Sequence, residues 1–286
     1  MKKNPLISSS LFCAGLVIIV LLAMSSMAAA QTTVFQDNME GGSGGLNGRT
    51  VSPTAQVGAS NQWWGSQSGQ TGTQLSVGNT TATFGKAAAG FDDALLAPGT
   101  TRFTMTTSWN IDDTTWVDTG SNIYFGFGNA SGDGRGDGQA TSPTNGFYDN
   151  QLAFGFKLVG DFTGTSATIK AGLGNNPSDY SATFERSSDS VDWAGDFQIT
   201  YDMPTSMAYL SFKNTGNGET TFTQLAAVSY TGDIGGIWFK ADSLSTAAHA
   251  GFLFDDIMVT AVPESASYAL IAGALGLTCV MIRRRR

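Results

Sequence analysis

Apolar and polar side chains alternate with a period of two along much of the chain. In the segment 101–111, TRFTMTTSWNI, Phe103 and Met105 fall on one face and polar residues on the other. In 151–159, QLAFGFKLV, every second residue from Leu152 onward is apolar. This alternation predicts antiparallel β-strands that bury one face in a core and expose the other to water.

Similar short runs recur between turns rich in glycine and asparagine, such as KNTGNGET and YTGDIGG. The segments with this pattern are 101–111, 123–127, 151–159, 166–172, 196–201, 207–213, 220–228, 236–241 and 251–260. Many strands at short spacing predict an all-β fold, a two-sheet antiparallel jelly-roll sandwich. No Pro-rich linker divides the body, so we expect one domain over 31–261, with its first and last strands side by side as in closed sandwiches.

The N-terminus has the pattern of a secretory signal peptide. Lys2 and Lys3 precede an apolar run over 11–23, and three alanines then supply small residues before Gln31. This predicts a signal helix within 1–30 that is removed before Gln31. The alternative is an uncleaved membrane anchor.

The C-terminus ends in a second apolar run, over 266–282, followed by four arginines at 283–286. Its length is at the short end of what spans a bilayer. The arginines predict a cytoplasmic C-terminus and a body on the other side of the membrane.

The charge is unevenly distributed along the chain. Of its 15 Lys and Arg residues and 23 Asp and Glu residues, the body keeps nine and 22, a net charge of −13. Such a body is a poor partner for nucleic acid, whose phosphates need cations. Both cysteines, Cys13 and Cys279, lie in the terminal segments, so the core must hold the body together without disulfides.

The body contains little that could perform catalysis. His249 is the only histidine, which leaves a histidine base or a zinc site without support. Glycoside hydrolysis needs two carboxylates. The glutamates Glu40, Glu185 and Glu219 stand apart in the sequence and do not form the Glu-x-Asp-x-x-Glu run that laminarinase-type jelly-roll hydrolases carry on one strand. We therefore expect a protein that is not an enzyme, with a glycoside hydrolase as the least favoured alternative.

Acidic residues at both ends of the body form a candidate calcium site. Asp37 and Glu40 follow the first apolar stretch, and Asp255 and Asp256 lie in the last one. If the first and last strands pair, these carboxylates converge, and calcium prefers such oxygen ligands. The ion would be structural. The Gly-rich segment 129–139 is a weaker candidate, and a mobile hairpin loop is its favoured interpretation.

Three tryptophans are candidates for stacking on sugar rings, because they lie in polar, loop-like contexts: Trp63, Trp64 and Trp116. The remaining tryptophans that lie in alternating runs, Trp109 and Trp238, fit a core better. Packing is the alternative for all of them, because burial is the commoner use of aromatic side chains.

The opening segment, FQDNMEGGSGGLNGRTVSPTAQVGASNQWWGS, resembles the start of concanavalin A-like, laminin-G-type jelly rolls. The matching features are an acidic first strand, the run Leu46 to Arg49, and Trp63–Trp64. The resemblance covers most of 33–261. It implies a jelly-roll body of a kind found in glycan-binding, glycan-hydrolysing and adhesion proteins, and the fold does not choose among them.

The tail resembles the PEP-CTERM sorting signal. Val262, Pro263 and Glu264 match the start of its Val-Pro-Glu-Pro motif, and Ser265 replaces the second proline. The apolar segment and the terminal arginines Arg283, Arg284, Arg285 and Arg286 complete the pattern over 262–286. The resemblance implies a bacterial protein that an exosortase cuts and releases from the inner membrane to the cell surface or matrix. A permanent anchor is the alternative.

Together these patterns predict a non-enzymatic exported protein of the cell surface or extracellular matrix, associated with exopolysaccharide. Its partners would be the exosortase and, before processing, the membrane. A glycan-binding jelly-roll module with a dedicated aromatic site is the alternative function.

Overall fold

The structure is a computed structural model of the 286-residue chain. It describes residues 32–39, 44–46, 63–66, 68–77, 84–90, 100–111, 119–129, 152–161, 164–174, 176–187, 193–232, 234–242 and 252–263. Almost all of them belong to one compact unit, Thr33–Ala261.

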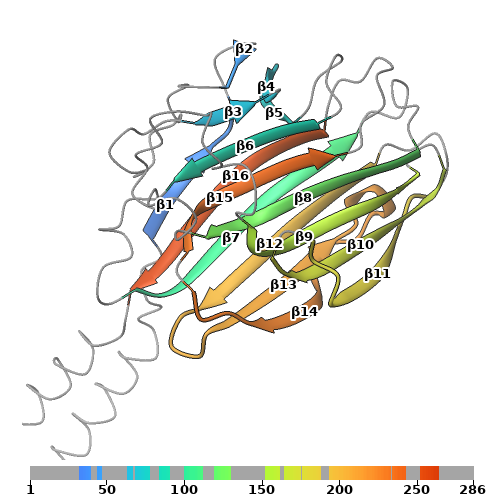
Figure 1. Ribbon diagram of the computed structural model, residues 1–286. Coiled ribbons are helices and arrows are strands. Elements are labelled where there is room, and N and C mark those ends of the chain that lie inside the picture. The colour runs from blue at the N-terminus through green and yellow to red at the C-terminus, as the bar shows by residue number, and fades with distance from the viewer. Residues whose placement is uncertain are drawn as a thin grey trace, which may run out of the picture. The chain divides into compact units, whose positions relative to one another are not determined.

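The described residues form two β-sheets (Figure 1). The nine-stranded sheet has the order β14 (Thr223–Ser229), β13 (Met207–Lys213), β12 (Trp193–Asp202), β7 (Thr100–Ile111), β16 (Phe252–Pro263), β5 (Gln74–Val77), β4 (Ser68–Thr71) and β2 (Gly44–Gly45), with β1 (Thr32–Asp37) paired to β16. The seven-stranded sheet has the order β11 (Tyr180–Glu185), β10 (Ser166–Leu173), β9 (Leu152–Asp161), β8 (Thr119–Asn129), β15 (Ile234–Asp242), β6 (Phe84–Gly90) and β3 (Trp64–Ser66). The prediction of an all-β antiparallel two-sheet sandwich is confirmed, as is the pairing of its first and last strands.

An aromatic cluster fills the space between the sheets. The ring of Phe125, on β8, lies 4.8 Å from that of Phe197 on β12 and 5.2 Å from that of Phe254 on β16, measured between ring centres. It also contacts Phe156 and Phe239 of its own sheet. Edge-to-face and offset aromatic pairs of this kind contribute beyond the area they bury. The cysteine-free body is therefore held by an interdigitated core, as its composition requires.

The alternation in β7 is confirmed, because Phe103, Met105 and Trp109 are all buried on the inner face. The alternation predicted for β9 is wrong at its first residue, Leu152. Opposite Phe127 and Gly128 the register of β9 shifts, and one residue is inserted into the strand. Ala153 consequently enters the core, and Leu152 turns to the outer face of the sheet.

A second break in alternation occurs in β16, at the acidic pair. Phe252 and Phe254 point into the core before it, and Ile257 does so after it. Asp256 has a φ of 49°, and the hydroxyl of Thr107 on β7 donates to the Asp255 carbonyl at 3.0 Å. The pair thus forms a β-bulge, with one residue in the left-handed region that Asp tolerates better than most.

Candidate functional site

A row of five residues crosses the seven-stranded sheet from β6 to β10. Lys86 on β6 lies opposite Lys240 on β15, and Lys240 lies opposite Tyr124 on β8. Tyr124 in turn lies opposite Lys157 on β9, which lies opposite Lys170 on β10. We call these five residues the lysine row. It contains four of the nine basic residues of a body whose net charge is −13.

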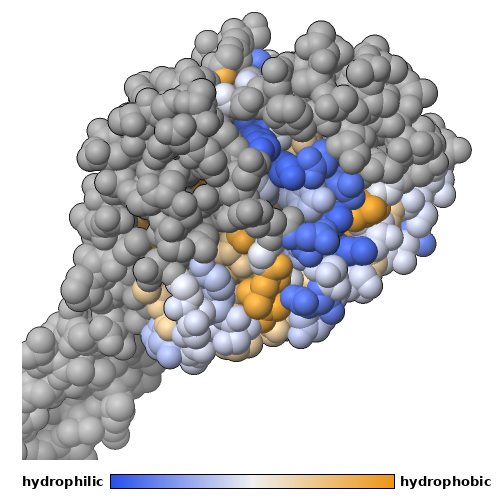
Figure 2. All heavy atoms as spheres, in the orientation of Figure 1, coloured by the Kyte–Doolittle hydropathy of each residue, from blue (hydrophilic) through white to orange (hydrophobic). Residues whose placement is uncertain are grey.

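The lysine row lies on the outer face of the sheet. On β8, β9 and β15 its members alternate with Phe125, Phe156 and Phe239, which are fully buried between the sheets. All four lysine side chains are partly exposed. Figure 2, drawn in the orientation of Figure 1, shows strongly hydrophilic residues gathered in a band across this part of the molecule.

The two lysine pairs of the row are opposed like charges. Lys86 faces Lys240 and Lys157 faces Lys170 across adjacent strands, in direct register. Like charges directly opposite each other destabilise a sheet by up to about 1 kcal/mol per pair. The body has only nine basic residues, so a high lysine content does not explain why four of them lie together.

Tyr124 receives cations from the strands on both sides. The ammonium nitrogen of Lys157 lies 5.1 Å from the centre of its ring, and that of Lys240 lies 5.3 Å from it. Both distances are in the range of a cation–π interaction. Burial, with a smaller effect from the charge of Asp242, raises the pKa of Tyr124 to about 12. Tyr124 is 6% exposed, so its neutral ring lies largely covered beneath the two cations that it gathers.

Two polar partners orient the lysines. Asp242 forms an ion pair with Lys240 at 2.6 Å, and the Asn176 side-chain oxygen accepts from Lys157 at 2.8 Å. Burial first, and then the charge of Lys170, lowers the pKa of Lys157, and Lys240 adds to this effect while Asp242 opposes it. The row is therefore electrostatically strained around Lys157 even though one carboxylate lies close by.

A small apolar cluster borders the row on the same face. It consists of Ala88, Tyr124, Leu152 and Trp238 and is separate from the core between the sheets. Trp238 is 2% exposed, and within the described part of the chain its indole Nε1 has no hydrogen-bond partner. A buried donor without a partner is costly and uncommon. Trp238 is thus buried, as its alternating context predicts, but beside the row and not in the main core.

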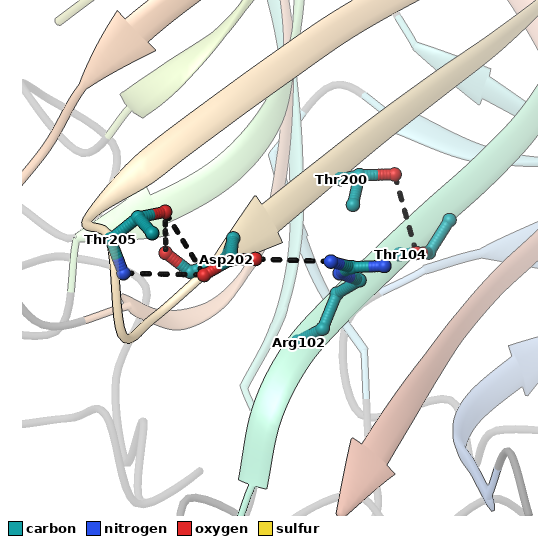
Figure 3. A network of polar contacts seen from close by, with 5 residues as sticks. All are labelled: Arg102, Thr104, Thr200, Asp202 and Thr205. Carbon is teal, nitrogen blue, oxygen red and sulfur yellow. Dashed lines mark hydrogen bonds and ion pairs between the residues drawn. The ribbon is translucent and has the colours of Figure 1, made fainter. Parts of the chain in front are cut away.

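The outer face of the nine-stranded sheet has a different arrangement (Figure 3). Arg102 on β7 forms an ion pair with Asp202 on β12 at 3.0 Å, and the backbone N–H and hydroxyl of Thr205 donate to the same carboxylate. The hydroxyls of Thr104 and Thr200 lie 3.3 Å apart between these strands. The Arg102 guanidinium is the main cause that lowers the pKa of Asp202, assisted by Thr205 and opposed by burial.

A second ion pair on this face also joins two neighbouring strands. Lys213 on β13 lies 2.7 Å from the Asp196 carboxylate on β12, and Ser108 on β7 donates to the other oxygen at 2.9 Å. The ammonium of Lys213 also lies 5.1 Å from the ring centre of Phe222. Basic and acidic residues on this face therefore neutralise each other across neighbouring strands.

The tryptophans proposed for sugar stacking are not assembled into a platform. Trp63 is fully buried, packs against Phe35 at 5.5 Å between ring centres, and donates from its indole nitrogen to Asp37 at 2.7 Å. It has no exposed ring face, so the stacking interpretation of Trp63 is wrong and the packing alternative holds. Trp64 begins β3, but its side chain lies outside the described residues, as does all of Trp116.

The acidic residues proposed for calcium have other roles where the structure describes them. Asp37 is fully buried, and its carboxylate accepts from the Met39 backbone and from Trp63. Asp255 and Asp256 form the bulge in β16, and Glu40 lies outside the described residues. In the part of the chain that the structure describes, no three His, Cys, Asp or Glu side chains are grouped to hold a metal ion.

The terminal signals fall almost entirely outside the described residues. Val262 and Pro263 continue β16 to its end, whereas Glu264, the apolar segment 266–282 and the arginines at 283–286 lie beyond it. The proposed signal peptide, 1–30, also lies outside. Over the residues that are described, no helix is long and apolar enough to cross a membrane.

No known protein-family model and no curated protein sequence matches the chain. Solved structures resemble it at low identity. A CBM2 module of the evolved Dit of Lactobacillus casei BL23 phage J-1 has a TM-score of 0.47 and 11% identity, over 82% of this chain and 96% of that one. The acidic lectin of winged bean, complexed with methyl-α-D-galactose, has a TM-score of 0.45 and 11% identity, over 82% and 99%. The lectin of Bauhinia forficata in complex with GalNAc has a TM-score of 0.46 and 9% identity, over 81% and 98%. Likenesses this distant do not bear on ligand or activity.

Sequence reasoning missed the lysine row, although the sequence contains a signal for it. The four lysines lie between apolar or small neighbours in FGKAA, GFKLV, TIKAG and WFKAD, each at the outward position of a strand. A lone lysine in a strand reads as an ordinary solvated side chain. Only the register between five strands brings the four lysines into one line.

Proposed function

We propose that this chain is a non-enzymatic exported protein that binds a polysaccharide on the outer face of its seven-stranded sheet. The observation that carries the proposal is the lysine row, with Tyr124 at its centre. It lines up four partly exposed ammonium groups, which are hydrogen-bond donors, over a largely buried aromatic ring and its bordering apolar cluster.

The length of the row favours a polymer over a small molecule. Neighbouring strands lie about 4.8 Å apart, so the row from Lys86 to Lys170 spans roughly 19 Å in a straight line. An extended chain can contact all five members at once, whereas a single sugar or a small anion would contact two or three. The row therefore suits a linear polymer that lies across the strands.

The terminal patterns support an extracellular setting for this binding. We propose that the signal segment 1–30 directs export and that an exosortase acts on the tail 262–286. Because β16 extends to Pro263, a cut after Glu264 would leave the strand intact. Mass spectrometry of the protein released by its native host should give a chain that begins at Gln31 and ends near Glu264. A released or surface chain that keeps Arg283–Arg286 would contradict processing.

Binding is tested by affinity electrophoresis of the full chain through gels that contain neutral or acidic polysaccharides. We expect at least one polysaccharide to retard the chain, and no retardation by any of them would overturn the proposed function. The site is located by comparing Tyr124→Ala, in the row, with Tyr209→Ala, an exposed tyrosine on β13 of the other sheet. Only the first should weaken retardation, and circular dichroism should show that both variants remain folded.

In this proposal the lysines bind the polysaccharide directly, without a metal ion. Treatment with EDTA should leave both the retardation and the Tm of the chain unchanged. A fall in Tm that added Ca²⁺ reverses would favour the calcium hypothesis, with Glu40 joining Asp37, Asp255 or Asp256 as ligands.

A further inference from the structure

The positive charge of the row indicates which class of polysaccharide it binds. Two pairs of lysines are held in direct opposition, Lys86 with Lys240 and Lys157 with Lys170, and Asp242 is within ion-pair distance of one of them. Among the described residues, Lys170 forms no hydrogen bond or ion pair with another side chain. A neutral sugar would leave this repulsion in place, whereas an anionic ligand would relieve it.

From this arrangement we infer that the ligand is an acidic polysaccharide, whose carboxylates are bound by the two lysine pairs on either side of Tyr124. The inference rests on the proposed function, because it names the ligand class of the same site. Charge-assisted hydrogen bonds from ammonium to carboxylate are about twice as strong as neutral ones. Lys157 and Lys240 converge from opposite neighbouring strands on the Tyr124 ring, which is itself only 6% exposed, so one carboxylate at this point reaches both ammonium groups.

The remainder of the body restricts where such a polymer binds. With a net charge of −13, the body repels a polyanion over most of its surface. On the other sheet Arg102 and Lys213 are already paired with carboxylates. The lysine row is therefore the described surface where a polyanion meets an excess of positive charge.

A uronic acid polymer fits this site better than a nucleic acid does. Nucleic-acid binding depends on many phosphate contacts from a broadly basic surface, and single strands also need several stacking rings. The row offers four lysines and one tyrosine ring, on an acidic body. A polymer with one carboxylate per sugar matches a single line of cations.

The test uses the full chain with polygalacturonate and alginate, each compared with its methyl-esterified form, which keeps the backbone and removes the charge. We expect the acidic forms to bind at least tenfold more tightly than the esters, and the difference to shrink as NaCl is raised because salt screens exposed charges. Equal binding of acid and ester would overturn the inference and leave the proposed function standing. Binding of neutral polysaccharides alone would do the same. Failure of every polysaccharide, neutral or acidic, would overturn both.

Charge-matched variants locate the site. Lys157→Gln with Lys170→Gln removes two cations from the row, and Arg102→Gln with Lys213→Gln removes two from the opposite face. Each lysine lost removes a charge-assisted hydrogen bond, so the row variant should lose on the order of tenfold in affinity per lysine. The opposite-face variant should bind as the unmodified chain does. Equal losses in the two variants would show that net charge alone determines binding, and would overturn the inference.

Two further measurements exclude the nearest alternatives. The charge-preserving variant Lys157→Arg with Lys170→Arg should keep most of the affinity for alginate, which a loss caused by misfolding would not show. Single-stranded DNA of similar charge should bind at least tenfold more weakly than alginate. If it binds equally well, the row is a general polyanion site and the assignment to an acidic polysaccharide is wrong.

Discussion

The outer faces of the two sheets use the same kinds of side chains in opposite ways. On the nine-stranded sheet, Arg102 and Lys213 each lie within 3.0 Å of a carboxylate on a neighbouring strand. On the seven-stranded sheet the cross-strand neighbours are themselves lysines: Lys157 faces Lys170, and Lys240, which forms an ion pair with Asp242, faces Lys86. The first face pairs opposite charges across its strands, and the second places like charges opposite each other.

The contrast between the two faces indicates where function lies in a chain without recognisable catalytic residues. Cross-strand pairs are the unit of sheet stabilisation, and an optimised face would pair opposite charges. The seven-stranded face departs from this rule in two pairs, one on either side of Tyr124, and among the described residues the buried Trp238 nitrogen beside them has no hydrogen-bond partner. Local departures of this kind are expected at functional sites.

The largest expected effect comes from the close approach of β8 and β9 beneath the row. A Cβ added at Gly155 would lie 2.2 Å from the Phe125 carbonyl oxygen, so the two strands must separate to admit it. Gly155→Ala should lower the free energy of unfolding by about 3 kcal/mol and disturb the register between Tyr124 and Lys157. Urea denaturation checks the first effect, and weakened binding of alginate checks the second. A variant of unchanged stability would show that the strands are not so closely apposed.

A smaller effect is expected on the paired face at acid pH. The folded-state pKa of Asp202 is lowered from 3.8, mainly by Arg102. Its contribution is therefore fully present above the unfolded pKa and is lost as pH falls through the folded pKa. Asp202→Asn should cost about 1 kcal/mol at pH 7 and progressively less below pH 3.8. Denaturation midpoints of both proteins between pH 7 and pH 2.5 should converge, and parallel curves would contradict the assigned ion pair.

On the lysine row, deprotonation at alkaline pH is expected to increase stability. The pKa of Lys157 is lowered in the folded state from 10.5, by burial and by Lys170. The unfolded chain therefore binds more protons between the two pKa values, and this group's contribution to stability rises with pH across that window. Lys157→Gln should remove a small rise in stability as pH approaches 10.5 from below, measured by urea denaturation against the unmodified chain. A larger rise in the variant would contradict the strain at Lys157.

The strands with strong alternation were predictable from the sequence, and those without it were not. The segment 207–213 coincides with β13, and most other predicted strands differ from the observed ones by a few residues at either end. The strands β4, β5 and β6 were missed because SGQTGTQLSV and FGKAAAG are short or rich in small residues. The strand β11 was missed because four of its six side chains are exposed, as at an edge.

The candidate site was not predictable, because it depends on register. A shift of one residue in any of five strands would turn its member of the row into the core, and local sequence does not encode that alignment. Trp63 illustrates the opposite error, since its polar neighbours indicated exposure while Phe35 and Asp37 hold it in the core. The bulge at Asp255 was visible as a break in alternation, but two adjacent acids suggested a metal first.

The like charges of the lysine row lower the stability of the fold, whereas the ion pairs of the opposite face raise it. One matched pair of substitutions tests this contrast most directly: Lys170→Gln in the row and Lys213→Gln on the opposite face, measured as the change in Tm without ligand. Removing Lys170 relieves the repulsion with Lys157. It should therefore increase the free energy of unfolding by about 0.5 kcal/mol and raise Tm. Removing Lys213 leaves Asp196 without its cation and should lower Tm by a similar amount. Opposite signs support the account, and a fall in Tm for both variants would contradict it.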